Sequence, residues 1–108
     1  MADNADIFKG LLAKVGSGGT LNTEEAAHAF DIMMSGDATP SQMGGLLLAQ
    51  HTSGEPVEEV TGAAKTMRAK ATKIEAPDGA IDVVGTGGDR SGTYNISTCT
   101  CLLYTSPS

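Results

Sequence analysis

Helix start and stop signals divide the first 75 residues into four short segments, and these signals constrain the fold more than any other feature. Asn22 with Glu25 three residues later, and Thr39 with Gln42, each have the form of a capping box, which opens a helix. Pro56, followed by two acidic residues in the next turn, opens the fourth segment. Glycine and serine residues end the first three segments. The sequence therefore predicts an all-α region of four helices.

The apolar residues of each segment recur at helical spacing, so each predicted helix has an apolar face. These residues are Ile7, Leu11, Leu12 and Val15; Ala26, Phe30 and Met33 or Met34; Met43, Leu46 and Leu47; and Val57, Val60, Ala64, Met67 and Ala71. The acidic pairs Glu24–Glu25 and Glu58–Glu59 lie in first turns, where the helix dipole explains them without catalysis. The five Met residues are interpreted as core or interface residues rather than as a cofactor site.

Composition excludes several classes of function. The 108 residues carry a net charge of −6, which repels phosphate backbones and argues against nucleic-acid binding. Hydrophobic residues make up 40% of the chain, which argues against disorder. No apolar run approaches the roughly 20 residues of a membrane span, and the first residues lack the basic and apolar regions of a secretory signal. We therefore expect a cytoplasmic protein with no membrane partner.

The character of the chain changes after residue 75. Ala76–Gly79 is a turn signal, and Ile81–Val84 is a short β-prone run that leads into the glycine-rich segment Gly85–Asp89. Ile96–Thr98 has the form of a helix start. A single strand cannot form a sheet, so this one needs partners that the chain does not contain. We therefore expect residues 76–100 to begin an α/β domain that is truncated here.

The glycine-rich segment and the helix start that follows it are the candidate functional site. Glycines let successive backbone N–H groups turn toward an anion, and a helix N-terminus adds the positive end of a dipole. The dinucleotide fingerprint would need Gly where Arg90 stands, and the Walker A pattern would need Lys where Thr93 stands. The pattern therefore favours a phosphate or diphosphate ligand without matching either motif, and a plain tight turn is the alternative.

Residues Asp82–Thr98 resemble the phosphoribosyl-diphosphate loop of the anthranilate phosphoribosyltransferase family. The agreement covers the β-prone run, the Gly-Thr-Gly-Gly-Asp loop, the Ser-Gly-Thr stretch and the Asn-Ile-Ser-Thr helix start. Leu21–Ala26, Met33–Pro40 and Gly54–Ala64 are similar to the N-terminal helices of the same family, so the resemblance spans about residues 5–98. It implies an α/β parent protein whose N-terminal helical domain is residues 1–75.

The resemblance also implies an activity and its site. The family transfers the phosphoribosyl group from phosphoribosyl diphosphate to anthranilate in tryptophan biosynthesis, giving N-(5-phosphoribosyl)anthranilate and diphosphate. The positions that it implies for binding phosphoribosyl diphosphate are Gly85, Gly88, Asp89, Thr93, Asn95, Ile96, Ser97 and Thr98. Gly85 would also contact anthranilate, and Ser97 would ligate Mg²⁺. The resemblance implies no catalytic base in this chain, gives Arg90 no role, and implies a homodimer through the helical domain.

The end of the chain departs from the family. Residues 101–108 are what a transposase-type sequencing adapter encodes when it is read in frame, so we expect the biological frame to end near Thr100. Cys99 and Cys101 would then not act together as a metal-binding or redox pair. Two sulfur ligands are in any case fewer than the four of a structural zinc site. Because the resembled family has further basic and acidic residues downstream, we expect this chain alone to be inactive.

Two other interpretations stay open. The parent could be a paralogue with the same fold and a different acceptor, which residues downstream of this chain would decide. Alternatively, the chain could be a non-enzymatic helical association module whose glycine loop is a vestige. The second interpretation predicts that the loop has no affinity for diphosphates.

Overall fold

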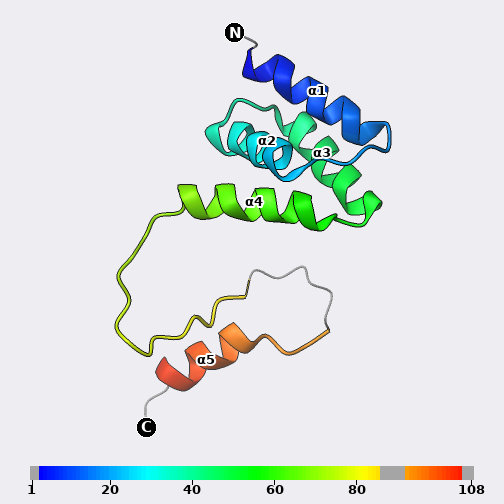
Figure 1. The fold of residues 1–108 in the computed structure, drawn as a ribbon. Coiled ribbons are helices and arrows are strands. Elements are labelled where there is room, and N and C mark those ends of the chain that lie inside the picture. Colours follow the sequence, from blue (N-terminus) through cyan, green and yellow to red (C-terminus); the bar gives the residue numbers. More distant parts are fainter. Residues whose placement is uncertain (1–2, 86–91, 106–108) are drawn as a thin grey trace. The chain divides into compact units, whose positions relative to one another are not determined.

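The computed structural model describes residues 3–85 and 92–105 of the chain. The chain divides into two compact units, residues 1–72 and residues 73–108. The described residues form four helices in the first unit and one in the second, and Figure 1 labels them. They are α1 (Asn4–Gly16), α2 (Thr23–Ser35), α3 (Pro40–Ser53), α4 (Val57–Lys70) and α5 (Ile96–Thr105). The four predicted helices of the first unit are therefore confirmed.

Both predicted capping boxes form. The Asn22 side chain accepts a hydrogen bond from the Glu25 N–H, and the Glu25 carboxylate accepts one from the Asn22 N–H, each at 2.9 Å. Thr39 and Gln42 make the same reciprocal pair, at 3.3 and 2.9 Å, at the start of α3. Each pair satisfies two N–H groups that a helix start otherwise leaves without partners. These two starts are thus determined by short-range sequence alone.

The core of the first unit is small. The largest apolar side chains that lie fully buried in it are Phe8, Leu21, Ile32 and Leu46, and alanines fill the space between the helices. The apolar stripe predicted on α4 is different, because Val57, Val60 and Met67 are exposed. Hydrophobic spacing therefore identified α4 as a helix without showing which of its sides is buried.

Helix α4 contacts α2 through a face made of small and polar residues. A Cβ atom on Gly62 would lie 2.7 Å from the Ala26 Cβ and 2.8 Å from the Ala27 N, so only glycine allows this approach. The Thr66 hydroxyl donates a hydrogen bond to the Ala27 carbonyl at 3.0 Å. Near the end of α4, Lys70 forms an ion pair with Asp31 at 2.9 Å. Close backbone packing, rather than a stripe of large side chains, holds this pair of helices together.

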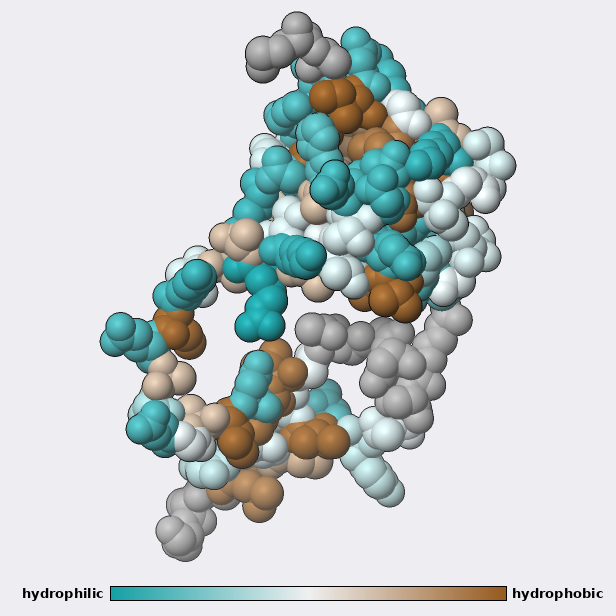
Figure 2. Space-filling model, in the orientation of Figure 1, coloured by the Kyte–Doolittle hydropathy of each residue, from teal (hydrophilic) through white to brown (hydrophobic). Residues whose placement is uncertain are grey.

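The described residues of the second unit do not show the predicted strand. Ile81–Val84, predicted as a strand, forms no strand and pairs with no strand among the described residues, and its Val84 N–H donates to the Asp82 carboxylate at 2.8 Å. A strand needs a ladder partner, and the described residues offer none. None of the described residues of this unit is buried, and Figure 2 shows hydrophobic side chains on its surface. The described residues therefore show only the helical part of the predicted fold.

The described part of the chain contains no helix that is both long enough and apolar enough to span a membrane.

Candidate functional site

The candidate site lies in the second unit, where the start of α5 meets the residues that precede the glycine loop. Six of the eight sequence-predicted binding residues are described, and Gly88 and Asp89 lie outside the described residues. The described six are Gly85, Thr93, Asn95, Ile96, Ser97 and Thr98. Thr93 comes directly after Gly92, whose φ of 66° falls in the left-handed region that glycine tolerates, and α5 begins at Ile96.

Asn95 caps the start of α5. Its side-chain oxygen accepts a hydrogen bond from the Thr98 N–H at 2.9 Å, and its backbone carbonyl accepts one from the Cys99 N–H at 3.0 Å. The cap fixes the first turn, which contains Ile96 and Ser97, at the positive end of the helix dipole. Four of the predicted binding residues therefore share one helix start, an arrangement that attracts anions.

Ser97 joins that helix start to the residues before the loop. Its hydroxyl donates to the Val83 carbonyl and accepts a hydrogen bond from the Gly85 N–H at 2.8 Å. Gly85 and Ser97, twelve positions apart, are thus brought together, as a shared site requires. A Cβ atom on Gly85 would lie 3.5 Å from the Ser97 hydroxyl oxygen, which is an ordinary contact.

The donors at this place fit a phosphate better than a protein-held metal. The described residues contain no cluster of three or more His, Cys, Asp or Glu residues that could enclose a metal ion. Mg²⁺, however, usually keeps several waters and takes one or two protein oxygens together with substrate phosphates. The Ser97 hydroxyl oxygen is partly exposed and accepts one hydrogen bond, so it can serve as such a single ligand.

Sequence reasoning missed one buried acidic residue in the first unit. Glu59, assigned with Glu58 to the helix dipole, is only 2% exposed, and its Oε1 accepts a hydrogen bond from the Leu21 N–H at 2.7 Å. The available signal was helical spacing, because Glu59 lies three residues before Gly62 and seven before Thr66, on the face that packs against α2. An isolated glycine inside a helix often indicates such close packing.

Comparison with known proteins gives relatives at high identity. The chain is 63% identical over 96 residues to an anthranilate phosphoribosyltransferase of Azospirillum brasilense, covering 89% of this chain and 27% of that protein. Proteins with the same name in Rhodopseudomonas palustris strain HaA2 and Bradyrhizobium sp. strain BTAi1 are 61% and 58% identical, with 89% of this chain and 28% of each relative covered. The chain thus spans little more than a quarter of the length of these relatives. No solved structure matches it.

A family model described as the helical bundle domain of a glycosyl transferase family matches residues 9–71. The match runs from the middle of α1 to the residue after α4, so it covers part of α1 and all of α2, α3 and α4. Since residues 9–71 are more than half of the 108-residue chain, the chain belongs to this glycosyl transferase family.

Proposed function

We propose that this chain is the N-terminal part of an enzyme that transfers the phosphoribosyl group of phosphoribosyl diphosphate to anthranilate. The observation that carries the proposal is the 58–63% identity to relatives that bear the name anthranilate phosphoribosyltransferase. The products are N-(5-phosphoribosyl)anthranilate and diphosphate, which places the parent in tryptophan biosynthesis. Because the chain spans about a quarter of these relatives, the chain alone is expected to be inactive.

The proposed binding site consists of the glycine loop and the start of α5. The residues proposed to bind phosphoribosyl diphosphate are Gly85, Gly88, Asp89, Thr93, Asn95, Ile96, Ser97 and Thr98. The capped helix start and the Gly85–Ser97 contact support this assignment, because they bring N–H and hydroxyl groups together. When bound, Mg²⁺ would neutralise charge on the diphosphate leaving group, and Ser97 is its proposed ligand. Gly85 is the proposed contact for anthranilate.

The proposed parent has a larger architecture than the described residues. Residues 1–75 are proposed to be its helical domain, residues 76–100 the start of an α/β domain, and residues 101–108 a non-native tail. Exposed apolar side chains on α3 and α4, among them Leu48 and Val57, support a homodimer through the helical domain. We place the parent in the cytoplasm.

A chimera tests the proposed function. Residues 1–98 of this chain would replace the matching N-terminal segment of the Azospirillum brasilense relative, and formation of phosphoribosylanthranilate would be followed by fluorescence. We expect the chimera to be active and Ser97→Ala to weaken the use of Mg²⁺ and phosphoribosyl diphosphate. A second substitution, Thr66→Ala in the helical domain, is the control for general damage, because Thr66 lies outside the proposed site.

The same chimera separates the alternatives. A folded chimera that binds phosphoribosyl diphosphate but does not use anthranilate would favour a paralogue with another acceptor. A folded chimera with no affinity for phosphoribosyl diphosphate would favour a non-enzymatic helical module. Full activity in Ser97→Ala would contradict the proposed Mg²⁺ ligand while leaving the enzyme assignment intact.

A further inference from the structure

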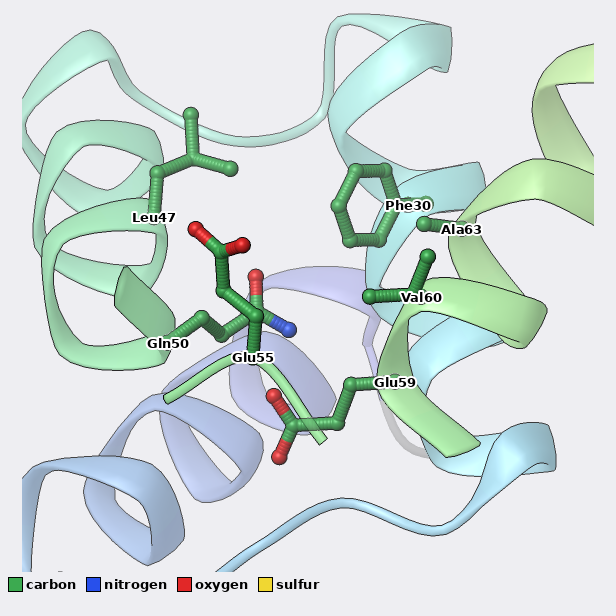
Figure 3. A pocket seen from close by; sticks show the side chains of 7 residues that line it. All are labelled: Phe30, Leu47, Gln50, Glu55, Glu59, Val60 and Ala63. Carbon is green, nitrogen blue, oxygen red and sulfur yellow. The ribbon is translucent and has the colours of Figure 1, made fainter. Parts of the chain in front are cut away.

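Among the described residues, two carboxylates accept a hydrogen bond from a backbone N–H group outside a helix cap: Glu59 from Leu21, and Asp82 from Val84. Glu59 is buried in the first unit, beside a cavity of about 200 Å³ (Figure 3) whose accessible lining is almost wholly apolar. Its bond holds α4 to the segment before α2 and is therefore part of the packing of that unit. Asp82 is exposed and lies three residues before Gly85, so its bond belongs to the candidate site.

The Val83–Val84 peptide group links Asp82 to Ser97. Its N–H, on Val84, donates to Asp82 Oδ1 at 2.8 Å, and its carbonyl, on Val83, accepts a hydrogen bond from the Ser97 hydroxyl. The Ser97 oxygen in turn accepts a hydrogen bond from the Gly85 N–H at 2.8 Å. These groups form one continuous series of hydrogen bonds, and every donor in it is directed toward the carboxylate. Hydrogen bonds in such a series polarise one another, so the carboxylate at its end strengthens the others.

This series of hydrogen bonds fixes the direction of the Ser97 hydroxyl. A serine hydroxyl has one proton, which rotates to suit its partners, and two acceptor lone pairs. Here the proton is directed to the Val83 carbonyl, and one lone pair accepts from the Gly85 N–H. The oxygen is partly exposed, and its second lone pair has no partner among the described residues. A cation requires such a lone pair and is repelled by a hydroxyl proton directed toward it.

Asp82 controls the carbonyl group that takes this proton. Asp and Asn side chains readily accept a hydrogen bond from the backbone N–H two residues further on. Because a peptide group is planar, a bond that holds the Val84 N–H also holds the Val83 carbonyl. Without the carboxylate, the peptide group is free to turn, and the Ser97 proton is free to rotate into the place of a cation.

We propose that Asp82 is a positioning residue for Ser97, the proposed ligand of Mg²⁺. By holding the Val83–Val84 peptide group, it directs the Ser97 proton to the Val83 carbonyl and keeps one Ser97 lone pair available to the cation. This inference rests on the proposed function, because that function requires Mg²⁺. Partners behind a metal ligand orient that ligand, and their loss typically lowers metal affinity by about 10–100-fold.

The chimera that carries residues 1–98 of this chain provides the test, with binding rather than turnover as the readout. Calorimetry of phosphoribosyl diphosphate at several Mg²⁺ concentrations, without anthranilate, gives the Mg²⁺ concentration for half-maximal binding. We expect Asp82→Ala to raise this concentration about tenfold, at the lower end of that range because Asp82 acts through a peptide group. Asp78→Ala removes the same charge from an exposed residue four positions earlier and should leave the concentration unchanged.

Two further substitutions separate the hydrogen bond from the charge. Asp82→Asn removes the charge but keeps an acceptor for the Val84 N–H, so it should remain within about threefold of the unmodified chimera. Asp82→Glu keeps the charge but displaces the oxygens by one CH₂ group, so it should resemble Asp82→Ala. The reverse order would assign the effect to the charge and overturn the proposal. These two variants decide the matter if Asp82→Ala does not fold by circular dichroism.

A double-mutant cycle shows whether Asp82 acts through Ser97. In a Ser97→Ala background, Asp82→Ala should cause no further loss of Mg²⁺-dependent binding, because the hydroxyl that it orients is absent. A full further loss would show that Asp82 acts independently of Ser97 and would overturn the proposal. Hydrogen exchange at the Gly85 N–H, measured without ligand, should become faster in Asp82→Ala and in Ser97→Ala but not in Asp78→Ala. Unchanged exchange in Asp82→Ala would also overturn the proposal.

The unmodified chimera distinguishes a failure of this inference from a failure of the proposed function. If the unmodified chimera binds phosphoribosyl diphosphate and a folded Asp82→Ala variant needs no more Mg²⁺, only the role of Asp82 is overturned. If the unmodified chimera binds no phosphoribosyl diphosphate at any Mg²⁺ concentration, the proposed function fails and this inference fails with it.

Discussion

Asn22 and Asn95 are N-caps of one helix in each unit of the chain, but the two helices differ in how much of their surface is buried. Each side chain accepts a hydrogen bond from an N–H three residues later at 2.9 Å, so each opens a helix. Helix α2 then buries Ala26, Ala29 and Ile32 between its neighbours, whereas α5 buries no residue. A cap determines where a helix starts, but packing partners determine most of its stability.

The same difference in packing partners explains why the β-prone run Ile81–Val84 forms no strand among the described residues. Ile81–Val84 has the composition of a strand, just as the segments of the first unit have the composition of helices. Helices satisfy their backbone hydrogen bonds internally, while strands need another strand beside them. A helical unit can therefore form from local signals and a small core, but a lone β-prone run stays unpaired.

The largest expected effect is loss of a fully buried leucine in the first unit. Leu46 is 0% exposed, and Leu46→Ala should destabilise this unit by about 2–5 kcal/mol because it leaves a cavity. Leu48, 65% exposed on the same helix, is the matched control, and Leu48→Ala should change stability by less than about 0.5 kcal/mol. Urea unfolding followed by circular dichroism measures both. Equal effects would show that α3 does not pack as described.

The next effect concerns the close contact between α2 and α4. Gly62→Ala places a methyl group against the backbone of α2 and should destabilise the unit by about 1–3 kcal/mol. Gly44 is also inside a helix, but a Cβ atom there would meet nothing within 4 Å. Gly44→Ala should therefore stabilise the unit by about 0.5–1 kcal/mol, since alanine favours helix more than glycine does. Opposite signs for the two changes are the expected result in thermal unfolding.

The N-cap side chains of α2 and α5 stabilise different units. Asn22→Ala should lower the unfolding free energy of the first unit by about 1 kcal/mol, the usual worth of an N-cap side chain. Asn95→Ala removes the equivalent bond in the second unit and should leave the unfolding of the first unit unchanged. Hydrogen exchange at the Thr98 N–H should nevertheless become faster in Asn95→Ala. A lower melting temperature of the first unit in that variant would show that the two units unfold together.

The sequence predicted those features whose causes are local. The four helices, both capping boxes and the start of α5 depend on residues within a few positions of one another, and all are present. The burial of Glu59 depends on a contact with Leu21, 38 positions away, so the dipole interpretation was incomplete. For the candidate site, the motif indicated which residues belong together, but not that the Ser97 hydroxyl would link Val83 and Gly85. Such long-range contacts follow from packing, which spacing alone does not reveal.

The smallest predicted effect is a pH dependence at Glu25. The Lys14 ammonium, which donates to both Glu25 oxygens at 2.7 and 2.8 Å, together with the Asn22 N–H, lowers the pKa of Glu25 below its ordinary value of 4.5. A lowered folded-state pKa stabilises the unit fully above the unfolded pKa, and this contribution disappears as the pH falls through the folded value. Glu25→Gln should therefore reduce the urea midpoint near pH 7, and variant and unmodified chain should converge in acid, well below pH 4.5.

A double-mutant cycle assigns that pH dependence to the Lys14–Glu25 pair. In a Lys14→Met background, Glu25→Gln should lose most of its pH-dependent effect, because the hydrogen bond from Lys14, the main cause of the lowered pKa, is then absent. The hydrogen bond from the Asn22 N–H to Glu25 remains in that background, so a small part of the pH-dependent effect should persist. Added salt should weaken the difference further, since both side chains contact solvent. An undiminished effect without Lys14 would instead assign the stabilisation to the capping box, and the link between α1 and α2 would then rest on apolar packing alone.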